Sequence, residues 1–145
     1  MILEVCVAVV RREGRLLVRR RPRGSHLAGT WEFPGGKRRP GERGRACAER
    51  ETREETGLVV RAGAEIARVR HDYPERRVLL RFFSCVAVVG RLRRSRALRW
   101  VSPRALRRMR IPEANRSLVR RLAGEAARYR TRPEIPALSG PAADR

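Results

Sequence analysis

The sequence predicts an α/β/α sandwich in which a mixed β-sheet lies between helices. Three observations support this fold. The chain has 145 residues, a length that suits one domain with a single core. Apolar segments with strand or helix periodicity follow one another in the order β-β-β-α-β-β-β-α. Beyond Arg130 the chain is rich in proline and poor in apolar residues, so we expect one domain over residues 1–130 and a flexible tail over residues 131–145.

The first three strands are expected in the N-terminal part of the chain. Residues 5–10 and 16–18 are rich in apolar and β-branched side chains, and a Glu-Gly pair separates them, so together they predict a β-hairpin. Residues 19–29 combine arginine, proline, glycine and serine and are expected to form a loop. Residues 31–33 predict a short strand that stops at the following Pro-Gly-Gly.

A helix is expected next, over residues 45–56. Gly57 follows it and can adopt the left-handed conformation that closes a helix. The helix start is weakly marked, because Arg43 and Gly44 stand where serine, threonine or aspartate would cap best. Glu42 supplies some compensating negative charge near that end.

Three strands and two helices complete the predicted order. Strands are expected at residues 59–69, 78–89 and 98–101. The second of these is the longest apolar run and should occupy the centre of the sheet. Ser102 and Pro103 should open a short helix, because serine caps well and proline suits the first helical turn. Residues 113–129 predict the last helix, since apolar side chains recur there every four residues.

The charge balance is strongly basic. The formal net charge is +21, and Lys37 is the only lysine, so almost all of the basic residues are arginine. Such an excess predicts attraction to polyanions, including nucleotides and nucleic acid. Two interpretations remain: a solvated basic surface that attracts nucleic acid nonspecifically, or a nucleic-acid partner with a biological role.

The cysteines and the N-terminus indicate a cytoplasmic protein. Cys6, Cys47 and Cys85 are odd in number, lie in apolar surroundings and form no Cys-x-x-Cys pair, so we expect buried free thiols in a reducing compartment. The apolar start of the chain is too short to span a bilayer and lacks the basic region of a signal peptide. We therefore expect no membrane association.

Residues 36–58 carry the most informative pattern, G-x5-E-x7-R-E-T-x-E-E-x-G-L. In a helix, Glu51, Glu54 and Glu55 stand three and four positions apart and share one face. Like charges at these spacings destabilise a helix, so their presence indicates a bound cation. Carboxylate oxygens suit a hard divalent ion, Mg²⁺ or alternatively Mn²⁺. An exposed acidic face without a ligand is the alternative.

This pattern resembles the Nudix box, and the chain resembles a Nudix hydrolase over about residues 3–129. The resemblance implies a Nudix-type α/β/α sandwich. It also implies a metal site made of Glu51, Glu54, Glu55 and the carbonyl oxygen of Gly35 or Gly36. Arg50 would pair with a neighbouring carboxylate and fix its conformation, and Lys37 would touch a phosphate or simply belong to the basic surface.

The implied reaction is attack of water on a phosphorus of a nucleotide, with Glu54 as the general base and Glu51 as the alternative. The chain departs from the family pattern at three positions. Thr52 replaces an aliphatic residue, and Arg43 stands where serine or threonine is usual. Arg99 precedes Trp100, where some relatives carry a glutamate.

Further fragments resemble the MutT-type branch, which cleaves oxidised guanine nucleotides: Arg20-Arg21, His26, residues 31–37, 73–76 and 111–115. On this resemblance Phe33 and Tyr73 would line a base pocket, and Arg21 and Arg76 would contact the nucleotide. Asn115 would read the purine edge. Core packing remains the alternative for the two aromatic side chains, and a helix-start role remains the alternative for Asn115.

The resemblance therefore implies a Mg²⁺-dependent hydrolase that converts 8-oxo-dGTP to 8-oxo-dGMP and pyrophosphate. Such an enzyme would clean the nucleotide pool and avoid mutation. A Nudix hydrolase of another nucleotide, such as CTP or a dinucleoside polyphosphate, is the first alternative. A noncatalytic nucleic-acid-binding protein is the second.

Overall fold

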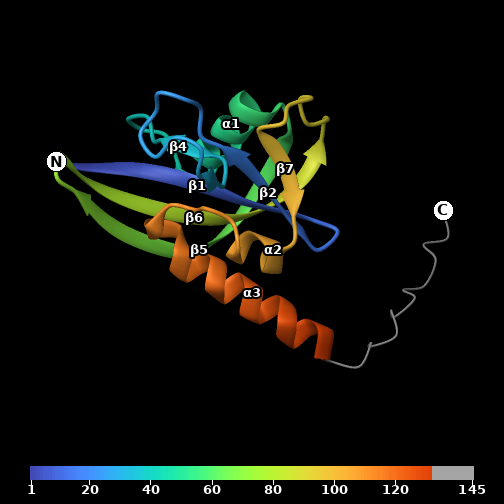
Figure 1. Cartoon of the computed structure of the whole chain (residues 1–145). Coiled ribbons are helices and arrows are strands. Elements are labelled where there is room, and N and C mark those ends of the chain that lie inside the picture. Colours follow the sequence, from blue (N-terminus) through green and yellow to red (C-terminus); the bar gives the residue numbers. More distant parts are fainter. Residues whose placement is uncertain (132–145) are drawn as a thin grey trace.

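The computed structural model describes residues 1–131 and is an α/β/α sandwich with a mixed seven-stranded sheet. The strands are β1 (Ile2–Arg12), β2 (Arg15–Arg20), β3 (Trp31–Glu32), β4 (Gly35–Lys37), β5 (Val59–Tyr73), β6 (Arg76–Val89) and β7 (Leu98–Val101). The helices are α1 (Gly44–Thr56), α2 (Pro103–Arg107), the 3₁₀ turn η1 (Glu113–Asn115) and α3 (Arg116–Thr131). In Figure 1, α1 covers one face of the sheet, and α2 and α3 cover the other. The predicted fold class is confirmed.

The sheet runs in the order β3-β2-β1-β6-β5, with β4 paired to β1 and β7 paired to β2. The β1–β6 pair is parallel and the other pairs are antiparallel, which makes the sheet mixed. The prediction that residues 78–89 lie at the centre is confirmed only in part, because β6 is an interior strand but β1 is the middle strand of this order. β6 is paired along its length with β1 on one side and β5 on the other, whereas β1 is the more completely buried of the two.

The period-two pattern of β1 builds two cores. Val7 and Val9 face the layer that contains α2 and α3, where they join Leu106, Leu118 and other apolar residues. Cys6, Ala8 and Val10 face α1 and meet Cys47 and Ala48. Burial of both strand faces explains the nearly continuous apolar run in the sequence.

Several predicted boundaries differ from the structure. β5 and β6 extend to a hairpin at Tyr73–Arg76, although this stretch is too polar to stand out as strand. Gly35–Lys37, expected as loop, pairs with β1 as β4. The last predicted helix begins as the 3₁₀ turn η1 before α3. The predicted tail at residues 131–145 lies almost wholly outside the described residues.

The expectation of buried thiols is confirmed, because all three cysteines are free and buried. Within residues 1–131, no helix is both long and apolar enough to cross a membrane.

Candidate active site

The three predicted carboxylates project from α1 beside β4. Helix α1 ends at Gly57, whose φ of 80° is left-handed and whose N–H donates to the carbonyl of Arg53. Arg43 makes no side-chain cap at the other end, as expected from its identity. The side chains of Glu51 and Glu55 are mostly buried, whereas that of Glu54 is half exposed. Burial therefore separates three residues that look equivalent in the sequence.

The side chain of Arg50 links the carboxylates on the acidic face of α1, which is the face that carries Glu51, Glu54 and Glu55. Its guanidinium donates to both oxygens of Glu42 (Nε–Oε2 2.7 Å and Nη2–Oε1 2.9 Å) and to Glu51 Oε1 at 2.8 Å. It also donates to Glu54 at 3.3 Å and to the carbonyl of Lys37 at 3.1 Å. The hydrogen bond from Arg50 lowers the pKa of Glu42 to about 2. Arg50 thus holds the carboxylates in place and ties α1 to β4.

Glu55 has a different environment. Its Oε1 accepts from the Gly35 N–H at 3.3 Å, and Arg19 Nη1 lies 2.9 Å from its Oε2. That approach does not meet hydrogen-bond geometry, so the buried Oε2 has no hydrogen-bond partner among the described residues. Burial raises the pKa of Glu55 to about 8, with repulsion from Glu51 and Glu32 adding to it and Arg19 opposing it.

Gly35 and Gly36 of β4 lie close to the carboxylates of α1. A Cβ at Gly36 would lie 2.3 Å from Cδ of Glu51 and 2.6 Å from each of its carboxylate oxygens. A Cβ at Gly35 would lie 2.6 Å from the Cys6 carbonyl oxygen on β1. The Gly-Gly pair therefore lets β4 lie against β1 and lets the Glu51 carboxylate lie against β4.

The donor set fits a hard divalent cation. Glu51, Glu54 and Glu55 offer only oxygen, as Mg²⁺ and Mn²⁺ prefer, and Glu55 Oε2 is buried without a hydrogen-bond partner among residues 1–131. Gly35 and Gly36 adjoin these carboxylates, and the Gly36 carbonyl accepts from the Cys47 thiol at 3.5 Å. In the described part of the chain, no three carboxylate, histidine or cysteine side chains converge as a preformed metal site. The reason is visible in the contacts, since Arg50 holds Glu51 and Glu54 while Arg19 lies against Glu55.

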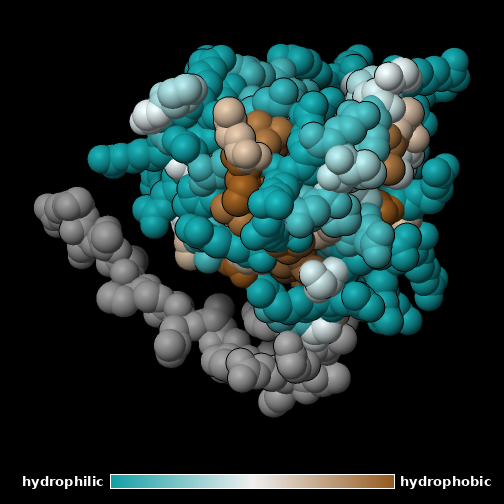
Figure 2. All heavy atoms as spheres, turned by 90° about the vertical axis from the view of Figure 1, so that its left-hand side faces the viewer, coloured by the Kyte–Doolittle hydropathy of each residue, from teal (hydrophilic) through white to brown (hydrophobic). Residues whose placement is uncertain are grey.

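A cavity of about 620 Å³ opens beside these groups. Its lining includes all six residues predicted to bind the nucleotide, together with both glycines: Arg21, Phe33, Gly35, Gly36, Lys37, Tyr73, Arg76 and Asn115. At the end of the molecule where β1 begins, Figure 2 shows a hollowed apolar band between hydrophilic surfaces. The volume lies in the range of about 300–1,000 Å³ typical of small-molecule sites.

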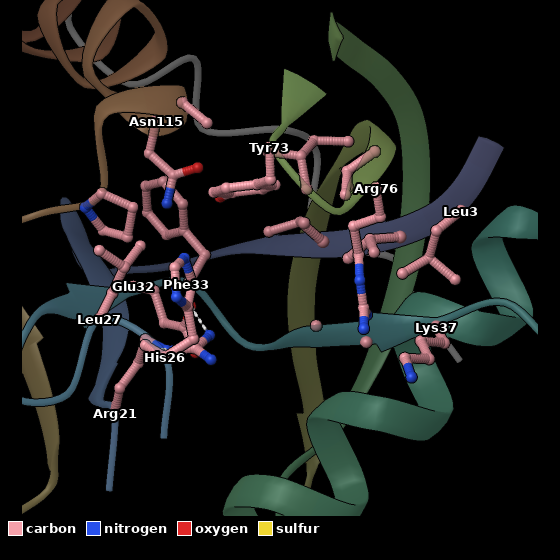
Figure 3. Close-up of a pocket in the computed structure, with 18 of the residues that line it drawn as sticks. Leu3, Arg21, His26, Leu27, Glu32, Phe33, Lys37, Tyr73, Arg76 and Asn115 are labelled. Atoms are coloured by element: carbon pink, nitrogen blue, oxygen red, sulfur yellow. Dashed lines mark hydrogen bonds and ion pairs between the residues drawn. The ribbon is translucent and has the colours of Figure 1, made fainter. Parts of the chain in front are cut away.

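The cavity carries aromatic side chains and Asn115 at one end and two basic side chains at the other. In Figure 3, Asn115, Phe33 and Tyr73 gather at one end, while Lys37 and Arg76 lie toward α1. Neither Lys37 nor Arg76 pairs with a carboxylate within residues 1–131. The arrangement suits a ligand with a flat ring at one end and negative charge at the other.

The aromatic side chains and Asn115 have distinct surroundings. Phe33 packs edge-on against Phe82 and belongs to the core cluster, so the core-packing interpretation holds for one side of its ring while the other lines the cavity. Tyr73 contacts His26 and His71 edge-on. Asn115 is buried in η1, and its side chain caps no backbone N–H in the described chain. Its amide therefore lies in the cavity wall without performing the helix-start role.

Arg21 is already engaged. Its Nε donates to the carbonyl of His26 at 2.6 Å, and its Nη1 donates to Glu32 Oε2 at 3.0 Å. It fixes the loop after β2 and also lines the cavity.

Sequence reasoning missed Arg19 and Glu32, which connect the cavity to Glu55. Glu32 accepts from both Arg19 and Arg21, and Arg19 continues to Glu55. Glu32 lies inside residues 31–37, and the resemblance of this segment to the MutT-type branch could have indicated a role for it. Glu42 received only a charge-compensating role in the sequence interpretation, although it is the principal partner of Arg50.

The departures from the family pattern have local explanations. Thr52 is fully buried, but its hydroxyl donates to the carbonyl of Ala48 at 2.7 Å. Arg99 lies over the ring of Trp31, 4.7 Å from its centroid, and makes no contact with the acidic face.

Comparison with known proteins identifies relatives of the domain. The model of the NUDIX domain matches residues 5–121. The chain is 36% identical to the CTP pyrophosphohydrolase of Escherichia coli over 104 residues, covering 70% of this chain and 77% of that protein. It is 30% identical to the 8-oxo-dGTP diphosphatase of Haemophilus influenzae over 131 residues, covering 88% and 96%. The crystal structure of the MutT protein from Methanosarcina mazei superposes with a TM-score of 0.74 at 30% identity, covering 86% and 94%.

Proposed function

The chain belongs to the Nudix hydrolase family, in the MutT-like branch that acts on nucleotide phosphoanhydrides, and on this basis we propose that it hydrolyses 8-oxo-dGTP to 8-oxo-dGMP and pyrophosphate. The observation that carries the proposal is the shared cavity. Six residues scattered between positions 21 and 115 line one space, and the glycines in its wall contact the carboxylates of α1. Such an enzyme would remove a mutagenic nucleotide from the pool.

The acidic face supplies the reaction site. Glu51, Glu54, Glu55 and the carbonyls of Gly35 and Gly36 would hold Mg²⁺ or Mn²⁺. When bound, the cation polarises a phosphate and lowers the pKa of water. Glu54 is the best placed general base because its side chain is half exposed, whereas those of Glu51 and Glu55 are mostly buried. It accepts the proton of the water whose oxygen attacks phosphorus, and the anhydride bond breaks to release pyrophosphate.

Different residues of the cavity contact different parts of the nucleotide. Phe33 and Tyr73 offer ring surfaces to the base, while Lys37 and Arg76, which pair with no carboxylate among residues 1–131, offer positive charge to the phosphates. Arg50 is not available to the substrate because Glu42, Glu51 and Glu54 occupy it, so it acts as a positioning residue.

Asn115 supports the choice of base. Oxidation of guanine at C8 converts N7 from an acceptor into an N–H donor, beside the unchanged O6 acceptor. The asparagine Oδ1 can accept from that N–H while Nδ2 donates to O6. Normal guanine would oppose Oδ1 with another acceptor, a buried mismatch of about 1–3 kcal/mol, or roughly ten- to a hundredfold in binding. Phe33 and the cavity shape must supply any further preference.

CTP is the second candidate, because the Escherichia coli CTP pyrophosphohydrolase shares 36% identity with this chain. Steady-state kinetics on 8-oxo-dGTP, dGTP, CTP and a dinucleoside polyphosphate, with Mg²⁺ and with EDTA, test the proposal. We expect the highest kcat/KM for 8-oxo-dGTP. Asn115→Ala should raise KM for 8-oxo-dGTP and narrow its lead over dGTP, while Ser117→Ala, at an exposed position two residues later, should not. Equal kcat/KM for the two guanine nucleotides, or a higher value for CTP, would overturn the assignment.

A further inference from the structure

A second cavity, of about 530 Å³, lies on the other side of Glu55. Six arginines line it, and Glu55 is its only acidic residue: Arg19, Arg20, Arg21, Arg23, Arg93 and Arg94. Its volume also falls in the range of about 300–1,000 Å³ typical of small-molecule sites. The nucleotide proposed above does not require this space for its base or for its ribose.

Three segments bring the arginines together. Arg19 and Arg20 end β2, Arg21 and Arg23 follow it, and Arg93 and Arg94 lie in the connection between β6 and β7. That connection is fastened at both ends. The Arg93 N–H donates to the carbonyl of Thr56 at the end of α1 at 2.9 Å, and the Arg20 N–H donates to the carbonyl of Ala97 at 2.8 Å. The arginines are therefore held beside the C-terminal end of the helix that carries the acidic face.

The charge in this cavity is unbalanced. Arg19 pairs with Glu32 and Glu55, and Arg21 pairs with Glu32. The other four arginines have no carboxylate within ion-pair distance among residues 1–131. Guanidinium groups bind phosphate oxygens in a bidentate geometry, so this set is suited to a compact anion with several phosphate oxygens.

The two cavities share a wall. Arg19 and Arg21 line both of them, and Glu55 lines the arginine-rich one while accepting a hydrogen bond from Gly35, which lines the other. The arginine-rich cavity therefore adjoins both the nucleotide cavity and the carboxylates of α1. We propose that this second cavity binds the terminal diphosphate of the nucleoside triphosphate and retains the pyrophosphate after cleavage. This inference rests on the proposed function.

Calorimetric titration of the full chain with inorganic pyrophosphate tests the site directly. Arg93→Gln/Arg94→Gln removes two exposed arginines of the cavity. Arg107→Gln/Arg108→Gln removes the same charge from two exposed positions at the end of α2. This helix covers the face of the sheet opposite to α1. At about 0.15 M salt, where distant surface charges are screened, we expect the first pair to weaken pyrophosphate binding at least tenfold. The second pair should change it less than twofold.

Binding of 8-oxo-dGMP serves as the internal control, because its base and single phosphate belong to the first cavity. We expect both double variants to bind 8-oxo-dGMP as the unmodified chain does. Equal weakening of pyrophosphate binding in the two variants would reveal diffuse attraction to the basic surface and overturn the inference, and so would unchanged binding in Arg93→Gln/Arg94→Gln.

The same titration separates this inference from the proposed function, because it needs no turnover. A chain that hydrolyses 8-oxo-dGTP but binds pyrophosphate independently of Arg93 and Arg94 would refute the cavity assignment alone. A chain that hydrolyses no nucleotide but loses pyrophosphate binding in that variant would refute the proposed function and retain the anion site.

Discussion

Replacing Gly36 by alanine should impair catalysis while leaving the fold intact. The backbone at Gly36 is not left-handed, so space alone decides the outcome. The added Cβ would lie 2.3 Å from Cδ of Glu51, whereas carbon atoms in contact lie about 3.5–4.0 Å apart. The Glu51 carboxylate must therefore move by more than 1 Å and would lose its 2.8 Å hydrogen bond from Arg50.

The expected losses of stability and of rate follow from the movement of the Glu51 side chain. The obstacle is the end of a long side chain, so the stability cost should be about that of one hydrogen bond to a charged group, roughly 1.5–3 kcal/mol. A misplacement of about 1 Å in an active site can reduce the rate about a hundredfold. We expect kcat/KM of Gly36→Ala to fall by roughly that factor.

Gly35→Ala is the matched control. Its Cβ would meet the backbone of β1, 2.6 Å from the Cys6 carbonyl oxygen and 2.9 Å from Cα of Val7, neither of which can rotate away. Overpacking of this kind costs about 1–3 kcal/mol or more, so this variant should be the less stable of the two. Urea unfolding measured beside steady-state kinetics separates the effects. A folded Gly36→Ala protein with unreduced kcat/KM would show that Glu51 does not take part in the reaction.

Three further outcomes are expected. Glu54→Gln should lower kcat at least about a hundredfold without unfolding the protein, and EDTA should abolish the unmodified activity; near-normal kcat in the variant would disprove its role. Binding of duplex DNA should weaken with salt at a log–log slope near −0.9 per phosphate neutralised and show no sequence preference, whereas undetectable binding at low salt would exclude nucleic acid as a partner. The hydrogen bond from Arg81 lowers the pKa of Glu65 below its ordinary value of 4.5, so the stability from this contact should be present above that pH and lost as pH falls through the lowered pKa. Urea unfolding of Glu65→Gln should depend less on pH below about 4.5, and identical profiles would contradict this assignment.

Local patterns predicted the elements that depend on local sequence. Helix α1 and its Gly57 closure agree with the predicted residues, and β1 follows its apolar run. Strand β4 was missed because a Gly-Gly pair has low strand propensity, and only pairing with β1 makes it a strand. The polar ends of β5 and β6 were missed for a similar reason, since they pair with each other across a hairpin.

In the site too, features that depend on local sequence could be predicted and contacts between distant segments could not. Glu51, Glu54 and Glu55 could be grouped from helical spacing, and the resemblance supplied residues that the structure brings to one cavity. The contact of Arg19 with Glu55 joins a strand to a helix 36 positions later, so no spacing rule could reveal it. Nor could the sequence show that Arg50 engages Glu42 more fully than the predicted carboxylates.

The parallel pairing of β1 with β6 has a consequence for how the chain folds. Ile2 pairs with Arg77 and Arg11 with Val86, so each contact joins residues 75 positions apart. Pairings this distant carry a large loop-closure cost and slow folding. During synthesis at about 5–20 residues per second, β1 must wait roughly 4–15 s for its partner. The strand that waits is strongly apolar, so a nascent chain exposes this segment to aggregation until β6 has emerged.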